Sequence, residues 1–409
     1  MPQFQEFFLH VLLQLIVIIV AARVGAWVLG KLGQPQVVGE IVAGLLLGPS
    51  VLGRISPETV AYLFPSETTT VFHVLSELGL VLLMFLIGLE FDFSHLRKVG
   101  RTAVGVASAG IVLPFLLGSG LALWMYPQVA ADVNRNAFVL IVAVAMSITA
   151  IPILGRIMIE LNIQRTRLGA LTITAAAIDD ALGWILLAAV SALIHGGFQL
   201  LPIVGMLGLT VFFVAGCWIV VRPLLARIAD FYLQRNQGEL SLVGFSVALI
   251  TILLAAAATS SIGIFAIFGP FVLGAVMSGH RPFAEAMGRR LKEIVYALLL
   301  PIFFTYTGLR TDIGLLDSWS HWLICGLVLA VAIAAKMGGC GIAARLGGMT
   351  WRESCSVAVM MNTRALMGLI AINVGRDLGV IPNSVFCMLV IMALVTTLVT
   401  TPVLRRLVA

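Results

Sequence analysis

The chain alternates long apolar runs with short polar stretches from one end to the other. An α-helix needs about 20 apolar residues to cross the hydrocarbon core of a bilayer. The pattern therefore predicts an all-α polytopic membrane protein with thirteen transmembrane helices. The predicted helices are 5–29, 36–53, 70–90, 100–126, 135–158, 166–195, 199–226, 240–258, 262–280, 288–308, 319–346, 354–376 and 382–407.

Basic residues predict how these helices are oriented in the membrane. Of the 25 Lys and Arg residues, nineteen lie in or beside the loops that follow odd-numbered helices, and four beside the others. Because basic loops stay in the cytoplasm, we expect the N-terminus outside and the C-terminus inside. The remaining two basic residues, Lys336 and Arg364, lie within predicted spans.

Composition supports a membrane protein with little soluble mass. The chain is 60% hydrophobic and 11% charged, where soluble domains carry about 25% charged residues. The net charge of +6 does not indicate nucleic-acid binding, because the basic residues are scattered singly over short loops. We expect the lipid bilayer as a partner, no nucleic acid, and no soluble domain after the last helix. The cysteines lack metal-type spacing and are predicted to be free, buried thiols: Cys217, Cys325, Cys340, Cys355 and Cys387.

Weak internal similarity predicts an inverted repeat. Gly88–Asp92, at the end of the third helix, and Gly308–Asp312, at the end of the tenth, share Gly-Leu-x-x-Asp at an offset of 220. Two glycines of the second helix also match two of the ninth: Gly39, Gly44, Gly269 and Gly274. Helices 1–6 thus pair with helices 8–13, and one half begins outside whereas the other begins inside. This arrangement is typical of secondary transporters.

The fifth helix of each half is interrupted by residues that disfavour a continuous helix. Helix 5 contains Met146–Pro152, in which the proline removes a backbone donor. Helix 12 contains the polar run Asn362–Arg364 inside an apolar span. Discontinuous helices at matching positions in two halves predict a binding site near the bilayer midplane.

Two adjacent carboxylates, Asp179 and Asp180, lie near the middle of the sixth helix. A charge at mid-membrane costs about 2.5–3.5 kcal/mol on insertion scales, and the two carboxylates also repel each other. Adjacent residues point about 100° apart on a helix, so the two can have different roles. The pair predicts a site for protons or a monovalent metal cation.

Other polar residues within spans are candidates for the same site. Lys336, near the centre of helix 11, needs a counter-ion, and either aspartate can supply it. Arg364 stays charged at any working pH, and it either caps the helix break or tunes the field of the site. Neutral oxygens that suit a hard cation are offered by Ser147, Thr149, Asn362 and Thr363.

Several alternatives have weaker or no support in the sequence. Glu40 and Glu77 either pair with basic groups or line a funnel to the site. The six histidines form no cluster, and there is no phosphate-binding glycine loop or nucleophile elbow. We therefore expect neither an ATP-driven pump nor a hydrolase, no enzyme activity, and no cofactor apart from the transported ions.

The motifs resemble those of the monovalent cation:proton antiporter-2 family, which includes sodium/proton antiporters and Kef- and CHX-type potassium exchangers. The resemblance covers nearly the whole chain. The motifs that carry it are Gln34–Glu40, Leu47–Pro49, Phe85–Glu90, Ser147–Pro152, Ala177–Asp180 and Met361–Leu366.

The resemblance implies a domain division and roles for the charged residues. Broken helices 5 and 12 cross beside the aspartates, Asp180 binds the cation, and Asp179 pairs with Lys336. A core transport domain moves against a dimerisation domain, and two chains form a homodimer. The dimerisation domain comprises 5–90 and 240–308, the core comprises 100–195 and 319–407, and helix 199–226 links the halves.

The ion is left open between two choices. The paired aspartates resemble sodium/proton members, whereas Asn362–Arg364 resembles the Kef and CHX branch. We expect a cation/proton antiporter of the cell's inner (plasma) membrane, with Na⁺ favoured and K⁺ close behind. The alternatives are a sodium-coupled solute symporter on the same scaffold and a cation channel.

Overall fold

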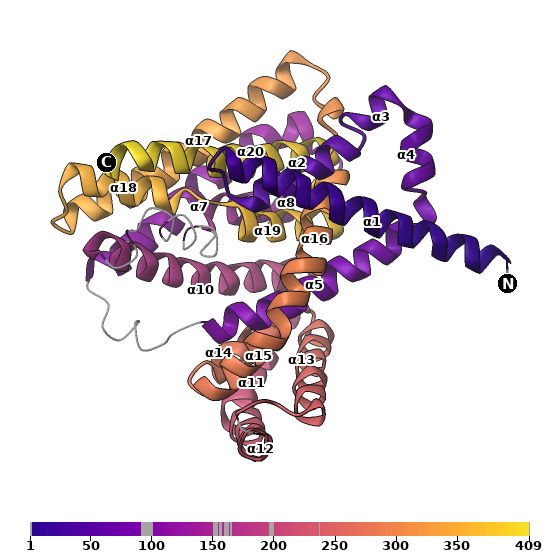
Figure 1. Cartoon of the computed structure of the whole chain (residues 1–409). Helices are drawn as coiled ribbons and strands as arrows, with labels where there is room; N and C mark the ends of the chain where they lie inside the picture. The colour runs from indigo at the N-terminus through magenta and orange to yellow at the C-terminus, as the bar shows by residue number, and fades with distance from the viewer. Residues whose placement is uncertain are drawn as a thin grey trace. The chain divides into compact units, whose positions relative to one another are not determined.

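The computed structural model describes residues 2–90, 101–149, 154, 158, 163, 166–195, 200–236 and 238–408. Within these ranges the chain is helical and contains no strand (Figure 1). The longer helices are α1 (Pro2–Lys31), α2 (Gln36–Leu47), α5 (Thr69–Glu90), α7 (Arg101–Val129), α8 (Arg135–Ser147), α10 (Arg167–His195), α11 (Leu200–Gly216), α12 (Arg222–Arg235), α13 (Leu242–Ile262), α14 (Phe268–Met277), α15 (Arg281–Ile294), α16 (Leu300–Leu309), α17 (Trp319–Leu346), α18 (Trp351–Met361), α19 (Ala365–Asp377) and α20 (Asn383–Val408).

Ten helical stretches in the described part of the chain are long and apolar enough to cross a membrane. Two shorter apolar helices, α8 and α14, accompany them. The described part of the chain is therefore all-helical, and its helices are those of a multi-pass membrane protein. The count of thirteen spans, the inverted repeat and the crossing of helices 5 and 12 stay predictions.

Proline, glycine and capping residues explain where the helices depart from the predicted ranges. The predicted helix 36–53 ends at Leu47, because Gly48 is the C-cap and Pro49 has no backbone N–H. Helix α18 begins at Trp351, before the predicted residue 354, because Thr350 and Glu353 form a capping box.

Both predicted helix breaks coincide with described helix ends. Helix α8 ends at Ser147, and Ile148 is extended. Residues 150–153, including Pro152, lie outside the described residues. Helix α18 ends at Met361 and α19 begins at Ala365, so Asn362–Arg364 separates two helices (Figure 1). The backbone groups freed at such ends need partners other than their own helix.

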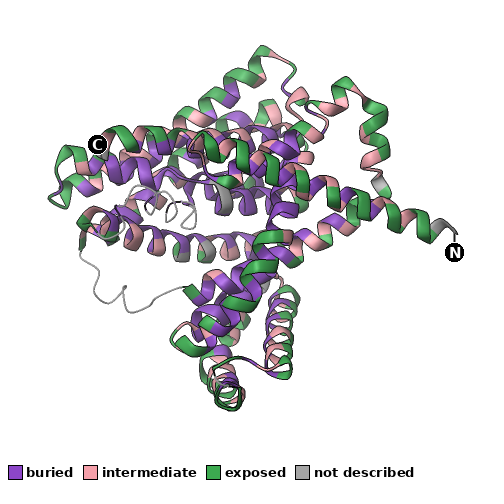
Figure 2. Ribbon diagram, viewed as in Figure 1, coloured by how far each residue is buried: buried purple, intermediate pink, exposed green. Residues whose placement is uncertain are grey.

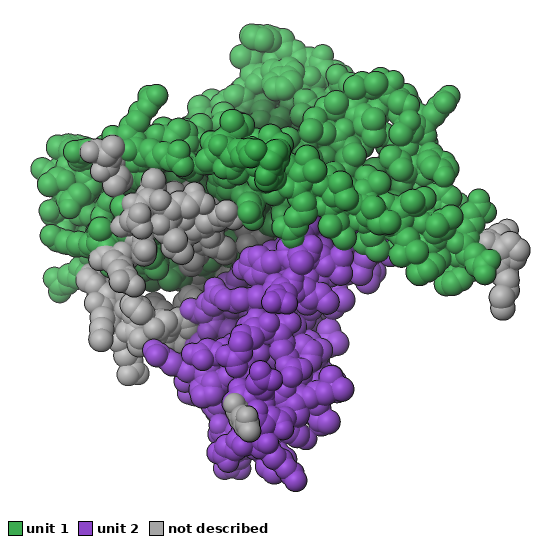
Figure 3. Space-filling view, viewed as in Figure 1, with its two compact units in different colours: residues 1–68, 95–187, 304–409 green, residues 69–94, 188–303 purple. Residues whose placement is uncertain are grey.

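The helices cluster into two compact units, coloured separately in Figure 3. Unit 1 comprises residues 1–68, 95–187 and 304–409, and unit 2 comprises 69–94 and 188–303. Unit 1 thus holds α1, α2, α7, α8, the first part of α10 and α16–α20 without the start of α16. The predicted core and dimerisation domains concern which helices move together, and this division stays a prediction.

Within unit 1 the helices around the predicted site are the most buried. Nearly every described side chain of α8 beyond its first turn is buried, as are most of α19 and α20 (Figure 2). By contrast, α1 exposes large apolar side chains such as Phe4, Ile16 and Trp27. An apolar exposed surface suits a helix that faces lipid, whereas α8, α19 and α20 pack against protein.

Glycines allow two helix pairs to approach closely. In unit 1, a Cβ on Gly44 of α2 would lie 2.1 Å from the carbonyl oxygen of Thr305 on α16. In unit 2, a Cβ on Gly274 of α14 would lie 2.2 Å from the carbonyl oxygen of Phe85 on α5. Gly308 and Gly88 lie on the opposite sides of these two contacts. Small residues of this kind let transmembrane helices pack backbone to backbone.

Replacing Gly44 by alanine should destabilise the fold. The added methyl group meets main-chain atoms, which cannot rotate away, and overpacking of this kind typically costs about 1–3 kcal/mol. Gly120→Ala on α7 is the control, because a Cβ there meets nothing within 4 Å. Thermal unfolding of the purified proteins should give a lower midpoint for Gly44→Ala. Equal midpoints for the two variants would contradict the close approach.

Candidate functional site

A buried ion pair joins α17 to α10 in unit 1. Lys336 Nζ donates to the two carboxylate oxygens of Asp179 at 2.9 and 3.1 Å. It also donates to the carbonyl oxygen of Gly110 at 2.8 Å and to that of Ser147. Both charged side chains are fully buried. Of the two aspartates that the sequence offered to Lys336, the structure places Asp179 against it.

The three N–H bonds of the ammonium group match these three acceptor residues. Burying a charged pair costs much of the Coulomb energy that it gains, unless further hydrogen bonds satisfy its remaining atoms. Gly110 and Ser147 supply those hydrogen bonds from the main chain. The glycine also leaves room, because a Cβ at Gly110 would lie 2.7 Å from Cys340 Sγ.

Thr149, just after the end of α8, forms hydrogen bonds with both α10 and α18. Its backbone N–H donates to Asp179 Oδ2 at 2.8 Å, and its hydroxyl donates to the carbonyl oxygen of Met361 at 2.9 Å. Because α8 ends at Ser147, this N–H has left the helical ladder and is available. The break in α8 thus positions Asp179 through the N–H of Thr149. The hydroxyl of Thr149 contacts Met361, the last residue of α18.

Asp180 is in a different position from its neighbour. It is 1% exposed, and neither of its carboxylate oxygens has a hydrogen-bond partner among the described residues. An ionised carboxylate without a partner is very costly to bury, so such a group is neutralised or binds a cation. The binding of a proton or a metal ion at Asp180 stays a prediction, and the buried oxygens without described donors are the observation that bears on it.

The neutral candidates for cation ligands differ in whether their polar groups already have hydrogen-bond partners. The hydroxyl of Ser147 donates to Ala143 O at 2.6 Å, and that of Thr363 donates to Met360 O at 2.8 Å. Both hydroxyls therefore bond to their own helix. Asn362, in the second break, is 3% exposed, and its Oδ1 has no partner in the part of the chain that the structure describes. Its amide oxygen is the neutral candidate that lacks a donor.

Arg364 connects the two helix breaks. Its guanidinium group is fully buried and donates to the carbonyl oxygens of Met146, on the last turn of α8, and of Ala332, on α17, the second at 2.6 Å. The carbonyls near a helix C-terminus carry partial negative charge. The contact with Met146 supplies a donor to a carbonyl group at the end of α8. A capping role for Arg364 stays a prediction. An effect on the field of the site stays a prediction.

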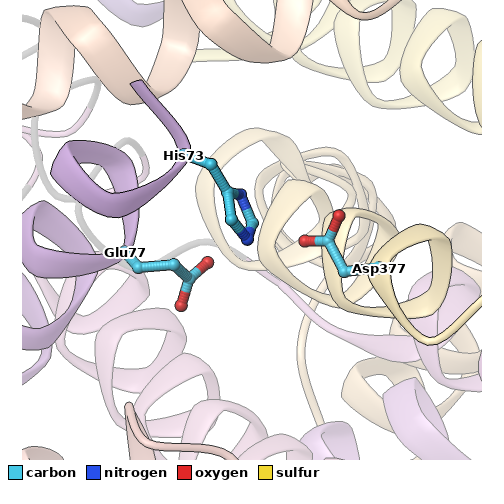
Figure 4. A group of neighbouring side chains, drawn as sticks. All are labelled: His73, Glu77 and Asp377. Carbon is cyan, nitrogen blue, oxygen red and sulfur yellow. The ribbon is translucent and has the colours of Figure 1, made fainter. Parts of the chain in front are cut away.

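Glu40 and Glu77, the two other acidic candidates from the sequence, lie on helices other than α10 and α17. Glu40 on α2 lies 3.8 Å from Arg23 on α1 and is largely buried. Glu77 lies one turn after His73 on α5 in unit 2, and both side chains extend from the same side of that helix (Figure 4). Figure 4 also labels Asp377, the last residue of α19 in unit 1.

The cysteine prediction needs one correction. All five cysteines are free thiols, and four are buried, but Cys355 is exposed. It lies three residues after the exposed Arg352, so both are on the outer face of the first turns of α18.

Main-chain acceptors such as the carbonyl groups of Gly110 and Ala332 could not be predicted, because carbonyl groups give no signal in a sequence.

Comparisons with known proteins agree with this fold. The structure resembles that of the sodium proton antiporter MjNhaP1 from Methanocaldococcus jannaschii, with a TM-score of 0.65, 17% sequence identity, and coverage of 98% of this chain and 96% of that one. The chain is 38% identical over 406 residues to the Na⁺/H⁺ antiporter NhaS4 of Synechocystis, covering 97% of each. It is 36% identical to cation/H⁺ antiporter 19 of Arabidopsis thaliana, covering 96% of this chain.

The sequence likenesses define the class: a multi-pass membrane protein related to cation/proton antiporters. Residues 17–409 match the family described as sodium/hydrogen exchanger, transmembrane. The chain belongs to that family. It spans about half (49%) of the length of the Arabidopsis antiporter.

Proposed function

We propose that the chain is a secondary active antiporter that exchanges a monovalent cation for protons. Na⁺ is the favoured cation, and K⁺ is the alternative. The observation that carries the proposal is the environment of Asp180, which is buried with both oxygens unpartnered among the described residues, next to an aspartate that already has its counter-ion.

The mechanism is competition at a single site. When Asp180 is ionised, a dehydrated cation binds to it. When Asp180 is protonated, the site is neutral and the cation leaves. An unoccupied carboxylate is too costly to carry past apolar walls, so only the cation-bound or protonated form crosses. This restriction couples the two fluxes.

The ligands of the cation come from the two helix breaks and from α10. Asp180 supplies the charge, and Asn362 supplies an amide oxygen that has no donor among the described residues. Asp179 is the neighbouring carboxylate in the sequence. Further oxygens are offered by Ser147, Thr149 and Thr363. Hard cations prefer such oxygen ligands. Lys336 and Arg364 keep the carboxylate and the helix ends in place, and no cofactor takes part.

We infer that thirteen helices form two inverted repeats, with a core domain that moves as an elevator against a dimerisation domain in a homodimer. The glycine contacts support the repeat. Gly44 on α2 packs against the segment that contains Gly308, and Gly274 on α14 packs against the segment that contains Gly88. These contacts are equivalent when the two halves are exchanged.

The charges of the loops support an orientation in the membrane. The excess of basic residues after odd-numbered helices favours an N-terminus outside and a C-terminus in the cytoplasm. We propose the inner (plasma) membrane of the cell as the site of action. Impermeant labelling of a single cysteine introduced at either terminus of the chain in whole cells tests this orientation.

Exchange in proteoliposomes tests the function. Vesicles with an acidic interior and an enclosed pH dye receive Na⁺, K⁺ or Li⁺ outside, and the expected result is alkalinisation that depends on the protein and on the cation. A symporter would move charge only with its solute and without proton flux, and a channel would dissipate a cation gradient without moving protons. Either result would overturn the proposal.

A further inference from the structure

A second group of charged residues lies in unit 1, at the end of α19 that is away from the second helix break. Helix α19 begins next to the second break and ends at Asp377. At 1.5 Å per residue its far end is about 18 Å from the break. A pocket of about 720 Å³ lies at this end, lined by residues of 128–133 and 379–384 together with Arg310, His321, Arg376 and Asp377.

Polar contacts join this end of α19 to α16. Arg310 Nη2, just after α16, donates to Asp377 Oδ1 at 2.6 Å, and Arg376 Nη1 donates to the carbonyl oxygen of Arg310 at 2.6 Å. One turn nearer the site, Asn373 Nδ2 donates to Thr307 Oγ1 at 3.1 Å. Residues three or four apart share a helix face. The contacts therefore form two levels along one helix–helix interface.

The two levels differ in their surroundings. The charged level faces the pocket, and its Arg310 and Asp377 side chains are 19% and 29% exposed. The neutral level is buried, with Asn373 6% and Thr307 1% exposed. A partly exposed ion pair contributes little to stability. The outer level can therefore open at low cost, and the inner level lies between it and the site.

Each side of the charged level is held by a different predicted domain. On the α16 side, Ser50 after α2 accepts from the backbone N–H of Ile313 at 3.0 Å and donates to Thr311 O at 2.7 Å. This fixes the segment after α16 to the turn that follows α2, which belongs to the predicted dimerisation domain. On the α19 side, the Arg376 guanidinium lies 4.5 Å from the ring centroid of Phe386 on α20, which is in the predicted core.

We propose that Arg310, Arg376 and Asp377 form a latch that closes the pocket end of the α16–α19 interface and opens before a cation reaches the site from the pocket. This inference rests on the proposed function, in which the core moves relative to the dimerisation domain. The polar Thr307 and Asn373 side chains then lie on the path that opens behind the latch.

Thiol labelling in the reconstituted full chain tests the latch. Thr307→Cys places a thiol of nearly the same size behind it, and reaction with a water-soluble maleimide is followed on that peptide by mass spectrometry. Adding Asp377→Asn should speed the reaction about fivefold, the shift expected from losing a partly exposed ion pair. The charge exchange Arg310→Asp with Asp377→Arg should slow it again.

The control is Glu90→Gln, which breaks the exposed Lys292–Glu90 pair of unit 2 and should leave the labelling rate unchanged. Equal rates with and without Asp377→Asn, or equal acceleration by Glu90→Gln, would overturn the latch. Hydrogen–deuterium exchange of the 373–380 peptide in Asp377→Asn needs no introduced thiol and should rise in the same way. These readouts require no transport, so absent exchange would reject the proposed function without deciding the latch.

Discussion

Asp180→Asn should abolish cation/proton exchange while leaving the protein folded. The amide cannot take up and release a proton, and it offers a cation one neutral oxygen in place of a carboxylate. Losing one partner of a buried charge contact costs about 3–5 kcal/mol, which is more than a hundredfold in affinity. Dye-monitored exchange in proteoliposomes should therefore fall to the level of empty vesicles.

The folded state should not suffer from this change. Both oxygens of Asp180 lack partners among the described residues, so the variant removes a desolvated charge and breaks no described hydrogen bond. The thermal midpoint should stay equal or rise. Asp230→Asn is a matched control, because Asp230 is 53% exposed and pairs with His280 in unit 2. Substantial exchange by Asp180→Asn would remove this residue from the mechanism.

Lys336→Met should strongly destabilise the protein. The substitution leaves the Asp179 carboxylate buried without its counter-ion, and it deprives the carbonyls of Gly110 and Ser147 of their donor. Removing one member of a buried pair typically costs about 3–5 kcal/mol. The thermal midpoint in detergent should fall accordingly.

Two further variants separate charge from packing. Lys336→Met combined with Asp179→Asn should recover part of the loss, because the unpaired charge is gone, and the double-mutant cycle gives the coupling between the two side chains. Lys292→Met is the control, since its pair with Glu90 is about half exposed and such pairs contribute at most about 1 kcal/mol. Equal destabilisation by the two lysine substitutions would contradict the assigned pairing.

The helices and the ionisable residues could be predicted from the sequence because both depend on composition along the chain. Apolar runs gave the helical ranges, and the cost of burying charge singled out Asp179, Asp180, Lys336 and Arg364. The predicted helix ends were less accurate where a proline or a capping residue ended a helix inside an apolar run, as at Pro49.

The detailed geometry could not be predicted, because it depends on main-chain atoms that every residue possesses. The sequence could not choose between Asp179 and Asp180 as partner of Lys336 without the family resemblance, since the choice depends on helix rotation. It also gave no indication that Arg364 contacts the carbonyls of Met146 and Ala332, or that Thr149 donates its N–H to a carboxylate.

The contacts of Arg364 have an evolutionary consequence. Both of its hydrogen-bond partners among the described residues are main-chain oxygens, so the identity of the side chains at positions 146 and 332 does not affect these hydrogen bonds. Relatives can therefore vary at those two positions as far as packing allows, without compensating changes elsewhere. The arginine itself has less freedom, since the two hydrogen bonds leave from different nitrogens of one guanidinium group, and substitutions there should be rare in any lineage that keeps both helix interruptions.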